Sequence, residues 1–536
     1  MRAPSVLRSI LFAIVLGSWP ALAQPDPSAH ILTPPPPAEP RINGPRVFGV
    51  RPGSAFLFSI PATGERPMRF AAEGLPAGLT LDPATGSITG SLGTPGEHIV
   101  TLVAVNGRGT ARRPLRIRVG ETISLTPPMG WNSWNCWGGA VSQDKVLSSA
   151  RAMVDRGLQQ HGWSYINIDD GWQGRRGGPF GAIQPNAKFP DMRALADEVH
   201  RLGLRFGIYS TPWRGTYAGH IGSSADNAAG TYAWQQSGEH NADDRIGRTD
   251  EVWDYARREH WQDGAVSMID RDIQQWVAWG VDYLKYDWYP IDAHTIEAVL
   301  APLRANSRDI VLSLSNNAHY DQAADWARLA NAWRTTQDIH DSWPRVVEIG
   351  FAQDRWAPYH GPGHWNDPDM LVLGRVGWGP TVRPTRLTPD EQYAHMSLWC
   401  LLSAPLLLGC DLASLDDFTL SLLTNDEVLA INQDPLGRQA TQMFNDGTRV
   451  VYVKSLEDGS LAIGLFNLGA KPTTVSAYWY QMPRPLTGTY RMRDVWRQKD
   501  IGTYTGEYHA TVSAEVAPHG VVLVQLIPAA APPANR

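Results

Sequence analysis

The 536-residue chain lacks the features of disulfide-stabilised, membrane-spanning and nucleic-acid-binding proteins. Its only cysteines are Cys136, Cys400 and Cys410, which allow at most one disulfide and leave one thiol over. Beyond an apolar run near the N-terminus, no stretch approaches the length that spans a bilayer. The formal net charge of −6 gives no basic face for a nucleic acid. We therefore expect a globular protein stabilised by packing, with no membrane span and no nucleic-acid partner, and we predict no particular oligomeric state.

The first residues have the pattern of a secretory signal. Residues 1–23 begin with basic side chains, continue with a short apolar run over 10–15, and end in the small-residue site Ala21-Leu22-Ala23. A proline-rich segment over 24–44 follows, and its composition predicts a stiff, extended linker. We expect export to the periplasm or the extracellular space, with residues 1–23 removed.

Residues 45–120 show short β-branched runs separated by Gly, Pro and Asn turns, which predicts a small β-sandwich. The runs cover 55–58, 87–90, 98–102 and 115–119. The cysteine and tryptophan spacing of an antibody domain is missing. The segments 74–82 and 85–90 nevertheless resemble the Ig-like modules attached to exported bacterial carbohydrate enzymes, which implies a spacer or docking role.

Residues 124–432 alternate predicted strands with amphipathic helices, such as the one that follows Ser142. The predicted strands lie at about 128, 164, 205, 282, 311, 332, 366 and 405. Eight such units predict a (β/α)8 TIM barrel. Three apolar runs over 450–454, 461–467 and 520–526 then predict an antiparallel β-sandwich over 437–528, with a loose tail over 529–536.

One predicted loop of the barrel, over about 214–268, is too long for an ordinary connection after a strand. Its aromatic content, including Trp234 and Trp253 together with His240, is wrong for a disordered segment. Because it follows the third strand, we expect it on the active-site face, as a lid or a wall beside the substrate.

The candidate chemistry centres on the strand over 281–288, which ends in Lys285 and Asp287. A buried strand has no packing reason to end in a lysine and a carboxylate, since each charge must be solvated, paired or used. Other strands also lead into polar residues, among them Asp169 and Asp170. The carboxyl ends of parallel barrel strands meet at one face, where such enzymes carry their active sites.

Five segments taken together resemble glycoside hydrolase family 27, which contains α-galactosidases and α-N-acetylgalactosaminidases. They are 126–134, 168–172, 283–287, 361–371 and 431–437, and they occur in the order found in that family. The resemblance implies a TIM barrel followed by a C-terminal β-sandwich. It also implies a retaining mechanism, which needs two carboxyl groups about 5 to 5.5 Å apart and neither metal nor organic cofactor.

By this resemblance Asp287 is the catalytic nucleophile and Asp338 the acid/base, with Arg334 as an arginine of the sugar pocket. Lys285, two residues from Asp287 on the same strand face, should keep Asp287 ionised and can donate to a sugar hydroxyl. An acid must hold its proton near neutral pH. We therefore expect Asp338 in the less polar, less cation-rich environment of the two. Asp341 follows the same strand and is a rival for this role.

The resemblance also assigns residues to the sugar pocket. Asp169 and Asp170 would accept hydrogen bonds from the O4 and O6 hydroxyls, Trp134 would lie under the apolar face of the sugar, and Tyr209 would line the pocket. Two adjacent aspartates could instead bind calcium or cap a helix. Asp369 could contact substrate or tie barrel loops together.

Two departures from the family pattern bear on the substrate. Gly171 and Trp288 stand where relatives commonly carry cysteines, so a disulfide of the pocket wall is absent. Ser315 and Ala318 fall where the resemblance places the residues that meet the C2 substituent, and small side chains there match N-acetylgalactosaminidases. We predict an exo-acting α-galactosidase for oligosaccharides or polysaccharides. The alternatives are α-N-acetylgalactosaminidase, another α-hexosidase or β-L-arabinopyranosidase and, remotely, a non-catalytic carbohydrate-binding protein.

Overall fold

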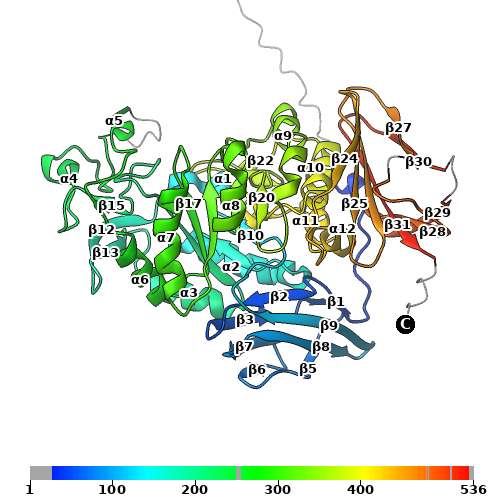
Figure 1. Ribbon diagram of the computed structural model, residues 1–536, viewed down its shortest axis with the longest axis horizontal. Coiled ribbons are helices and arrows are strands. Elements are labelled where there is room, and N and C mark those ends of the chain that lie inside the picture. The colour runs from blue at the N-terminus through cyan, green and yellow to red at the C-terminus, as the bar shows by residue number, and fades with distance from the viewer. Residues whose placement is uncertain (1–26, 249–254, 479, 481, 507–509, 530–536) are drawn as a thin grey trace, which may run out of the picture.

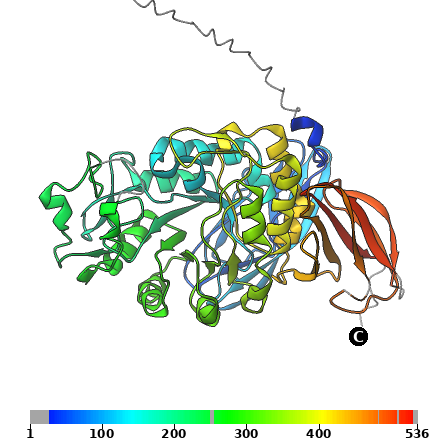
Figure 2. The ribbon, with the colours of Figure 1, turned by 90° about the horizontal axis from the view of Figure 1, so that it is seen from above.

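The computed structural model describes residues 27–248, 255–478, 480, 482–506 and 510–529. The predicted signal peptide, Trp253 and nearly all of the predicted tail lie outside these residues. The described chain forms an Ig-like module, a central barrel and a C-terminal β-sandwich (Figure 1). The insertion after the third barrel strand and the C-terminal sandwich lie at opposite ends of the long axis (Figure 1, Figure 2). No described helix combines the length and apolarity needed to cross a membrane.

Eight parallel strands form the central sheet, in the order β20-β19-β18-β17-β14-β11-β10-β23. They are β10 (Met129–Asn132), β11 (Tyr165–Asn167), β14 (Arg205–Ser210), β17 (Tyr283–Asp287), β18 (Val311–Ser315), β19 (Ala332–Arg334), β20 (Trp365–Asp367) and β23 (Leu406–Leu408). A parallel bridge between Leu371 and Leu408 closes the barrel. The eight predicted strands and the TIM-barrel fold are confirmed.

Helices surround the barrel and bury their apolar faces against it. They include α2 (Gln143–Asp155), α3 (Met192–Arg201), α6 (Ile269–Trp279), α7 (Ala293–Ala305), α8 (Ala323–Leu329), α9 (Trp343–Gly350), α10 (Pro389–Leu401), α11 (Asp417–Leu423) and α12 (Asp426–Asn432). Ser142 occupies the N-cap of α2, but its side chain makes no capping hydrogen bond. Thr388 and Glu391 form a full capping box at α10.

The insertion between β14 and α6 has a core of its own. Its elements are a ribbon of β15 (Ser224–Ala225) with β16 (Val266–Ser267) and the short helices α4 (Ala233–Ser237) and α5 (Tyr255–Arg258). Trp234 is 1% exposed and packs on the rings of Tyr232 and His260. Trp234 therefore packs in the core of the insertion and stabilises it.

The Ig-like module is a sandwich of two sheets over a continuous apolar core. One sheet holds β2 (Val47–Val50), β9 (Gly109–Val119), β8 (Gly96–Asn106) and β5 (Arg69–Glu73), and the other β3 (Ala55–Ser59), β7 (Ser87–Ser91) and β6 (Leu79–Leu81). The module lies beneath the barrel in Figure 1. There Arg51 donates through Nε to Asp309 at 2.7 Å. Asp309 lies just before β18, so the module covers the face of the barrel where the strands begin, opposite their C-terminal ends.

The proline-rich segment before this module is not a free tether. The Leu32 amide donates to the Tyr393 hydroxyl of α10 at 3.0 Å, and Asn425 donates to the Thr33 hydroxyl at 3.1 Å. The segment therefore runs along the outside of the barrel.

The C-terminal domain packs a six-stranded antiparallel sheet against a two-stranded one. The strands are β24 (Thr441–Asn445), β25 (Arg449–Ser455), β26 (Leu461–Asn467), β31 (Val521–Pro528), β28 (Thr489–Asp494) and β29 (Lys499–Thr505), with β27 (Thr473–Tyr478) paired to β30 (Thr511–Val516). Buried Lys454 of β25 donates to the Ile431 carbonyl of α12 at 2.5 Å, which joins the sandwich to the barrel. The predicted β-sandwich is confirmed.

Candidate active site

Polar side chains from neighbouring strands meet at the C-terminal rim of the barrel. In the parallel register Tyr209 lies beside Lys285, and Asp287 lies beside Ser315. The same pairing places Arg334 beside Asp367 on the next strands. Because side chains alternate along a strand, Lys285 and Asp287 share a face.

Asp287 ends β17 and is 6% exposed. Burial raises its pKa to about 7, although Lys285 acts in the opposite direction, and the charges of Asp338 and Asp169 raise it further. The Asn316 side chain donates to Asp287 Oδ1 at 3.4 Å. Lys285 itself pairs with Asp169 Oδ2 at 2.8 Å. Asp287 is therefore a buried carboxylate that shares Lys285 with a second carboxylate, Asp169.

Asp338 has the opposite environment from the one that we predicted for it. Its Oδ1 accepts from Arg334 Nη2 at 3.1 Å, and the same nitrogen contacts Asp369 Oδ2 at 2.9 Å. Burial would raise the pKa of Asp338, but the Arg334 and Lys285 charges outweigh burial and lower it. The Asp338 side chain is 67% exposed to solvent. The prediction of a cation-poor site was wrong. The sequence does not show which way the Arg334 side chain points, and in the structure it points at Asp338 and Asp369.

Asp341, the rival to Asp338, is committed elsewhere. It is completely buried, and Arg383 binds both of its oxygens, Nη1 at 2.5 Å and Nη2 at 3.0 Å. The Arg386 amide also donates to it at 2.8 Å. Such a saturated carboxylate is a structural ion pair, which leaves Asp338 as the carboxylate at the mouth.

The paired aspartates are both buried, and they differ in how fully they are bound. Asp169 Oδ2 accepts from Asn132 at 2.9 Å as well as from Lys285. Asp170 Oδ2 accepts from the Ala218 amide of the insertion at 2.8 Å, whereas Asp170 Oδ1 has no partner among the described residues. Burial raises the pKa of Asp170 to about 6. A buried carboxylate oxygen without a donor is suited to accept from a sugar hydroxyl.

Tyr209 lies within this group of carboxylates. It is 1% exposed, and no described residue bonds its hydroxyl. Burial, with the charges of Asp287 and Asp170, raises the pKa of the hydroxyl, which keeps it neutral. It is therefore available as a hydrogen-bond donor inside the pocket.

The remaining predicted site residues complete the walls. Trp134 opens the short helix α1 (Trp134–Trp137), is half-buried, and packs against an apolar cluster inside the barrel that includes Met370. Ser315 is 1% exposed with an unpartnered Oγ, and Ala318 is 5% exposed. Asp369 fixes Arg334 and accepts from the Ile339 amide at 2.7 Å, so its contacts in this structure tie loops together.

Sequence reasoning missed two residues beside the carboxylates. The Asn316 side chain donates to Asp287 Oδ1. Burial raises the pKa of Tyr217, which belongs to the insertion; the charges of Asp287 and Asp338 raise it further, and the Asn316 side chain acts against them. The insertion thus supplies a ring and a backbone amide to the site. Its position after the third strand was the available signal. Trp234 packs within the insertion and His240 contacts Asp244, and the lid role remains a prediction.

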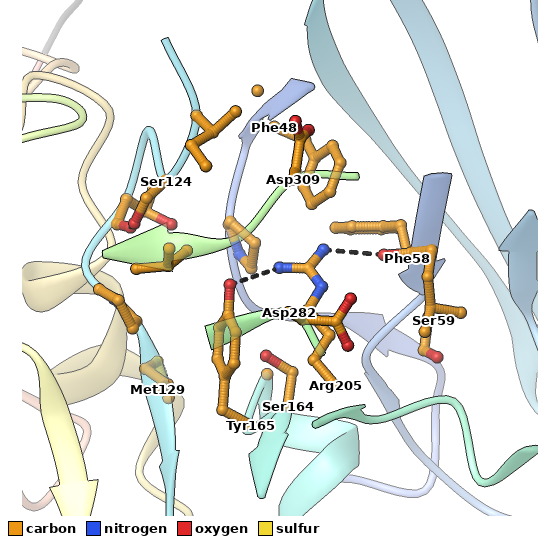
Figure 3. A pocket seen from close by; sticks show the side chains of 18 of the residues that line it. Phe48, Phe58, Ser59, Ser124, Met129, Ser164, Tyr165, Arg205, Asp282 and Asp309 are labelled. Carbon is orange, nitrogen blue, oxygen red and sulfur yellow. Dashed lines mark hydrogen bonds between the residues drawn. The ribbon is translucent and has the colours of Figure 1, made fainter. Parts of the chain in front are cut away.

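A second cavity lies at the other end of the barrel, between the barrel base and the Ig-like module (Figure 3). It measures about 310 Å³. Arg205 crosses it, donating to the Tyr165 hydroxyl at 2.9 Å and to the Leu57 carbonyl at 2.8 Å (Figure 3). Its guanidinium also lies 4.7 Å from the centre of the Phe48 ring. Because these polar groups bind one another, this cavity is an interdomain junction.

A TIM barrel with buried carboxylates, a lysine and an arginine on its C-terminal rim has the architecture of a glycoside hydrolase. A family model described as alpha galactosidase A matches residues 126–238 and 258–434. A model for the alpha galactosidase C-terminal beta sandwich domain matches 446–526, and an Ig-domain model matches 39–120. The chain therefore belongs to the alpha-galactosidase family, glycoside hydrolase family 27.

Individual relatives agree with this assignment. The chain is 34% identical to an alpha-galactosidase of Cyamopsis tetragonoloba, over 76% of this chain and 87% of the relative. It is 32% identical to alpha-galactosidase A of Cellvibrio japonicus, over 76% and 93% of the two chains. A crystal structure of a candidate alpha-galactosidase/melibiase from Bacteroides fragilis superposes with a TM-score of 0.78 at 33% identity, covering 91% of this chain and 98% of that one. A family 27 β-L-arabinopyranosidase of Geobacillus stearothermophilus gives a TM-score of 0.60 at 30% identity, covering 76% and 98%.

Proposed function

We propose that the protein is a retaining, exo-acting α-galactosidase in which Asp287 is the nucleophile and Asp338 the acid/base. The observation that supports this most is the buried Asp287 at the end of β17, on the same rim as the exposed Asp338 and electrostatically coupled to it. The Ala218 amide of the insertion donates to Asp170, so the insertion borders the site beside the paired aspartates. We infer that it blocks the path of a longer chain there, which favours the release of a terminal sugar.

In the first step the ionised Asp287 carboxylate attacks the anomeric carbon, and the bond to the leaving oxygen breaks. Asp338 gives its proton to that oxygen, so the leaving group departs as an alcohol. In the second step Asp338 takes a proton from water, the water oxygen attacks the anomeric carbon, and Asp287 is released. Two inversions at one carbon retain the configuration of the sugar.

The pKa directions of the two carboxyls are opposite to those that the first step needs. The pKa of Asp287 is raised to about 7, while that of Asp338 is lowered. Substrate corrects this order, because a sugar that covers the exposed Asp338 removes water from its charged form and raises its pKa. The two carboxyls titrate as a pair, and the productive form is the singly protonated one.

The paired aspartates favour galactose over a pentose. Asp169 and Asp170 lie where family resemblance puts the acceptors for O4 and O6. A β-L-arabinopyranoside lacks the C6 hydroxymethyl group, and it would leave the Asp170 oxygen without a donor. A buried acceptor left unpaired discriminates strongly against such a substrate.

The residues expected near the C2 substituent of the sugar support a second candidate, α-N-acetylgalactosaminidase. Ser315 and Ala318 are small, and Ser315 lies directly beside Asp287 in the barrel register. They leave room for an acetamide, although space alone changes binding by only about 1 to 3 kcal/mol. Comparing kcat/KM on nitrophenyl α-galactoside and its N-acetylamino counterpart tests the choice. We expect a higher kcat/KM on the galactoside. A clearly higher value on the acetamido sugar would favour α-N-acetylgalactosaminidase instead.

We also propose that the enzyme is exported, because residues 1–23 have the pattern of a signal peptide. Expression of the full chain in a bacterium should give mature protein outside the cytoplasm that begins at Gln24. Mass spectrometry of the N-terminal peptide checks this, and a cytoplasmic protein that retains Met1 would contradict it.

A further inference from the structure

Two exposed rings beside the carboxylates form a stacked pair that the proposed chemistry does not use. Tyr289 is 44% exposed. Its ring stacks on that of His319, with centroids 5.7 Å apart and planes inclined by 26°. We propose that this pair binds the departing sugar and forms a subsite for the second pyranose ring of an oligosaccharide substrate. The inference rests on the proposed α-galactosidase function and specifies its substrate class.

The chain places both rings at the active-site rim. Tyr289 follows the nucleophile Asp287 by two residues, and His319 directly follows Ala318. Their strands, β17 and β18, are parallel neighbours, so the loops that carry the two rings leave the same end of the barrel. Asn316, in the second of these loops, bonds Asp287 itself. The stacked pair therefore lies beside the nucleophile on the solvent side.

Packing does not explain this exposure. The large apolar or aromatic side chains that the structure shows as exposed are few: Ile99, Val105, Tyr289, Tyr320, Tyr478, Tyr480 and Ile501. The second of them in the barrel, Tyr320, is fixed in place. Its hydroxyl donates to the Arg355 carbonyl at 3.0 Å, and its ring packs on Trp356. Tyr289 instead presents its ring to solvent at the rim, in contact with His319.

The chemistry of the leaving group fits two flat rings at this place. The departing sugar is joined through the oxygen that Asp338 protonates, so it extends from the pocket towards solvent. Pyranoses carry apolar C–H faces that pack on aromatic rings, in the way that apolar surfaces pack on ring faces generally. In a stacked pair one ring holds the other in a fixed orientation, and the outer ring face remains free to pack on one hexopyranose.

The experiment compares a leaving sugar with a leaving group that has no ring. We would measure kcat/KM of the full enzyme on α-galactosyl-(1→6)-glucose and on α-galactosyl fluoride. Tyr289→Ala should lower the value on the disaccharide about three- to tenfold and change the value on the fluoride by less than about twofold. Tyr289→Phe should keep both values, because it keeps the flat ring. His319→Ala should also lower kcat/KM on the disaccharide and not on the fluoride. It replaces Tyr289→Ala in the test if that variant does not fold.

Tyr478→Ala is the matched control, since Tyr478 is 42% exposed on β27, in the C-terminal sandwich. It should change neither value. The proposal is overturned if the ring variants lose both substrates equally or lose neither. A wild-type enzyme that leaves α-galactosyl fluoride intact would contradict the proposed function itself, which separates the two failures.

Discussion

The two ends of the barrel differ in how their polar side chains are paired. At the base, charged groups bind one another: Asp282 accepts from Arg308 at 2.5 Å and contacts His200 at 2.8 Å, and Arg51 bonds Asp309. At the rim, several buried polar atoms have no partner among the described residues, namely Asp170 Oδ1, Tyr209 Oη, Ser315 Oγ and Arg334 Nε. Asn43 Oδ1, Arg113 Nε and Tyr283 Oη near the base also lack a described partner, but the charged pairs there join the domains. The unpartnered atoms of the rim lie among the candidate catalytic residues and are suited to bind a ligand.

The difference has an energetic meaning. A buried polar group without a partner costs about 1 to 3 kcal/mol, so each unpartnered atom of the rim destabilises the free protein. A substrate rich in hydroxyls can offset that cost on binding. Function is therefore expected where the polar groups are unsatisfied, and stability where they are paired.

The largest expected effect comes from removing the nucleophile. Asp287→Asn should lower kcat by about 10⁴-fold or more, because no covalent intermediate can form. Stopped-flow and steady-state assays on a nitrophenyl α-galactoside measure this. The control is Asp309→Asn at the base, which should lose stability but retain turnover per folded molecule, and similar losses of turnover in both variants would contradict the comparison.

Removing the acid/base should have an effect that depends on the leaving group. Asp338→Asn should cost about 10² to 10⁴-fold in kcat/KM on a disaccharide, whose leaving alcohol needs a proton. It should cost far less on α-galactosyl fluoride, whose leaving group needs none. Equal losses on the two substrates would show that Asp338 does not donate the proton.

Asp170 tests whether an unpartnered rim oxygen is reserved for substrate. Asp170→Asn should lower kcat/KM on an α-galactoside by about 10- to 100-fold, since hydrogen bonds to a charged group are worth about 1.5 to 3 kcal/mol. The loss on a nitrophenyl β-L-arabinopyranoside, which has no C6 hydroxyl, should be smaller. An unchanged ratio between the two substrates would exclude a contact to the C6 hydroxyl.

The pH dependence follows from the protonation of the pair. The singly protonated pair exists between the lowered pKa of Asp338 and the raised pKa of Asp287, which is about 7. Above that pH the pair loses its single proton, so kcat/KM should fall about tenfold per pH unit and the optimum should be acidic. In Asp338→Asn assayed on the fluoride, the fall above pH 7 should disappear. A fall that persists would assign it to another group.

The smallest effect on turnover is expected at the base. Arg205→Met removes two hydrogen bonds and should lower the free energy of unfolding by about 2 to 4 kcal/mol, with kcat/KM unchanged. Thermal unfolding measures this, with Arg151→Met as the control, because the Arg151 side chain is 59% exposed and makes only a long contact of 3.8 Å with Glu198. Tyr209→Phe at the rim gives the comparison. It removes a hydroxyl that has no described partner, so it should not lower the midpoint temperature of unfolding. A larger loss from Tyr209→Phe than from Arg205→Met would reverse the comparison.

The sequence predicted the parts of this account that depend on local pattern. Alternating apolar residues fixed the barrel strands, and the Lys285 and Asp287 spacing placed both on one strand face. The charge environment of Asp338 could not be predicted, since it depends on which way Arg334 turns between Asp338 and Asp369. The same holds for Tyr217, whose approach to Asn316 depends on how the insertion folds back. The contact between the Ig-like module and the barrel base was not predicted either, because nothing in the sequence around Arg51 and Asp309 indicates that these distant segments meet.

The configuration of the first-formed product tests the central claim most directly. Proton NMR during the first minutes of hydrolysis of an α-galactoside shows which anomer of galactose is released before mutarotation mixes the two. A carboxylate pair that acts through a covalent intermediate on Asp287 gives α-galactose first. β-Galactose as the first product would mean direct attack by water, and would contradict the role assigned to Asp287.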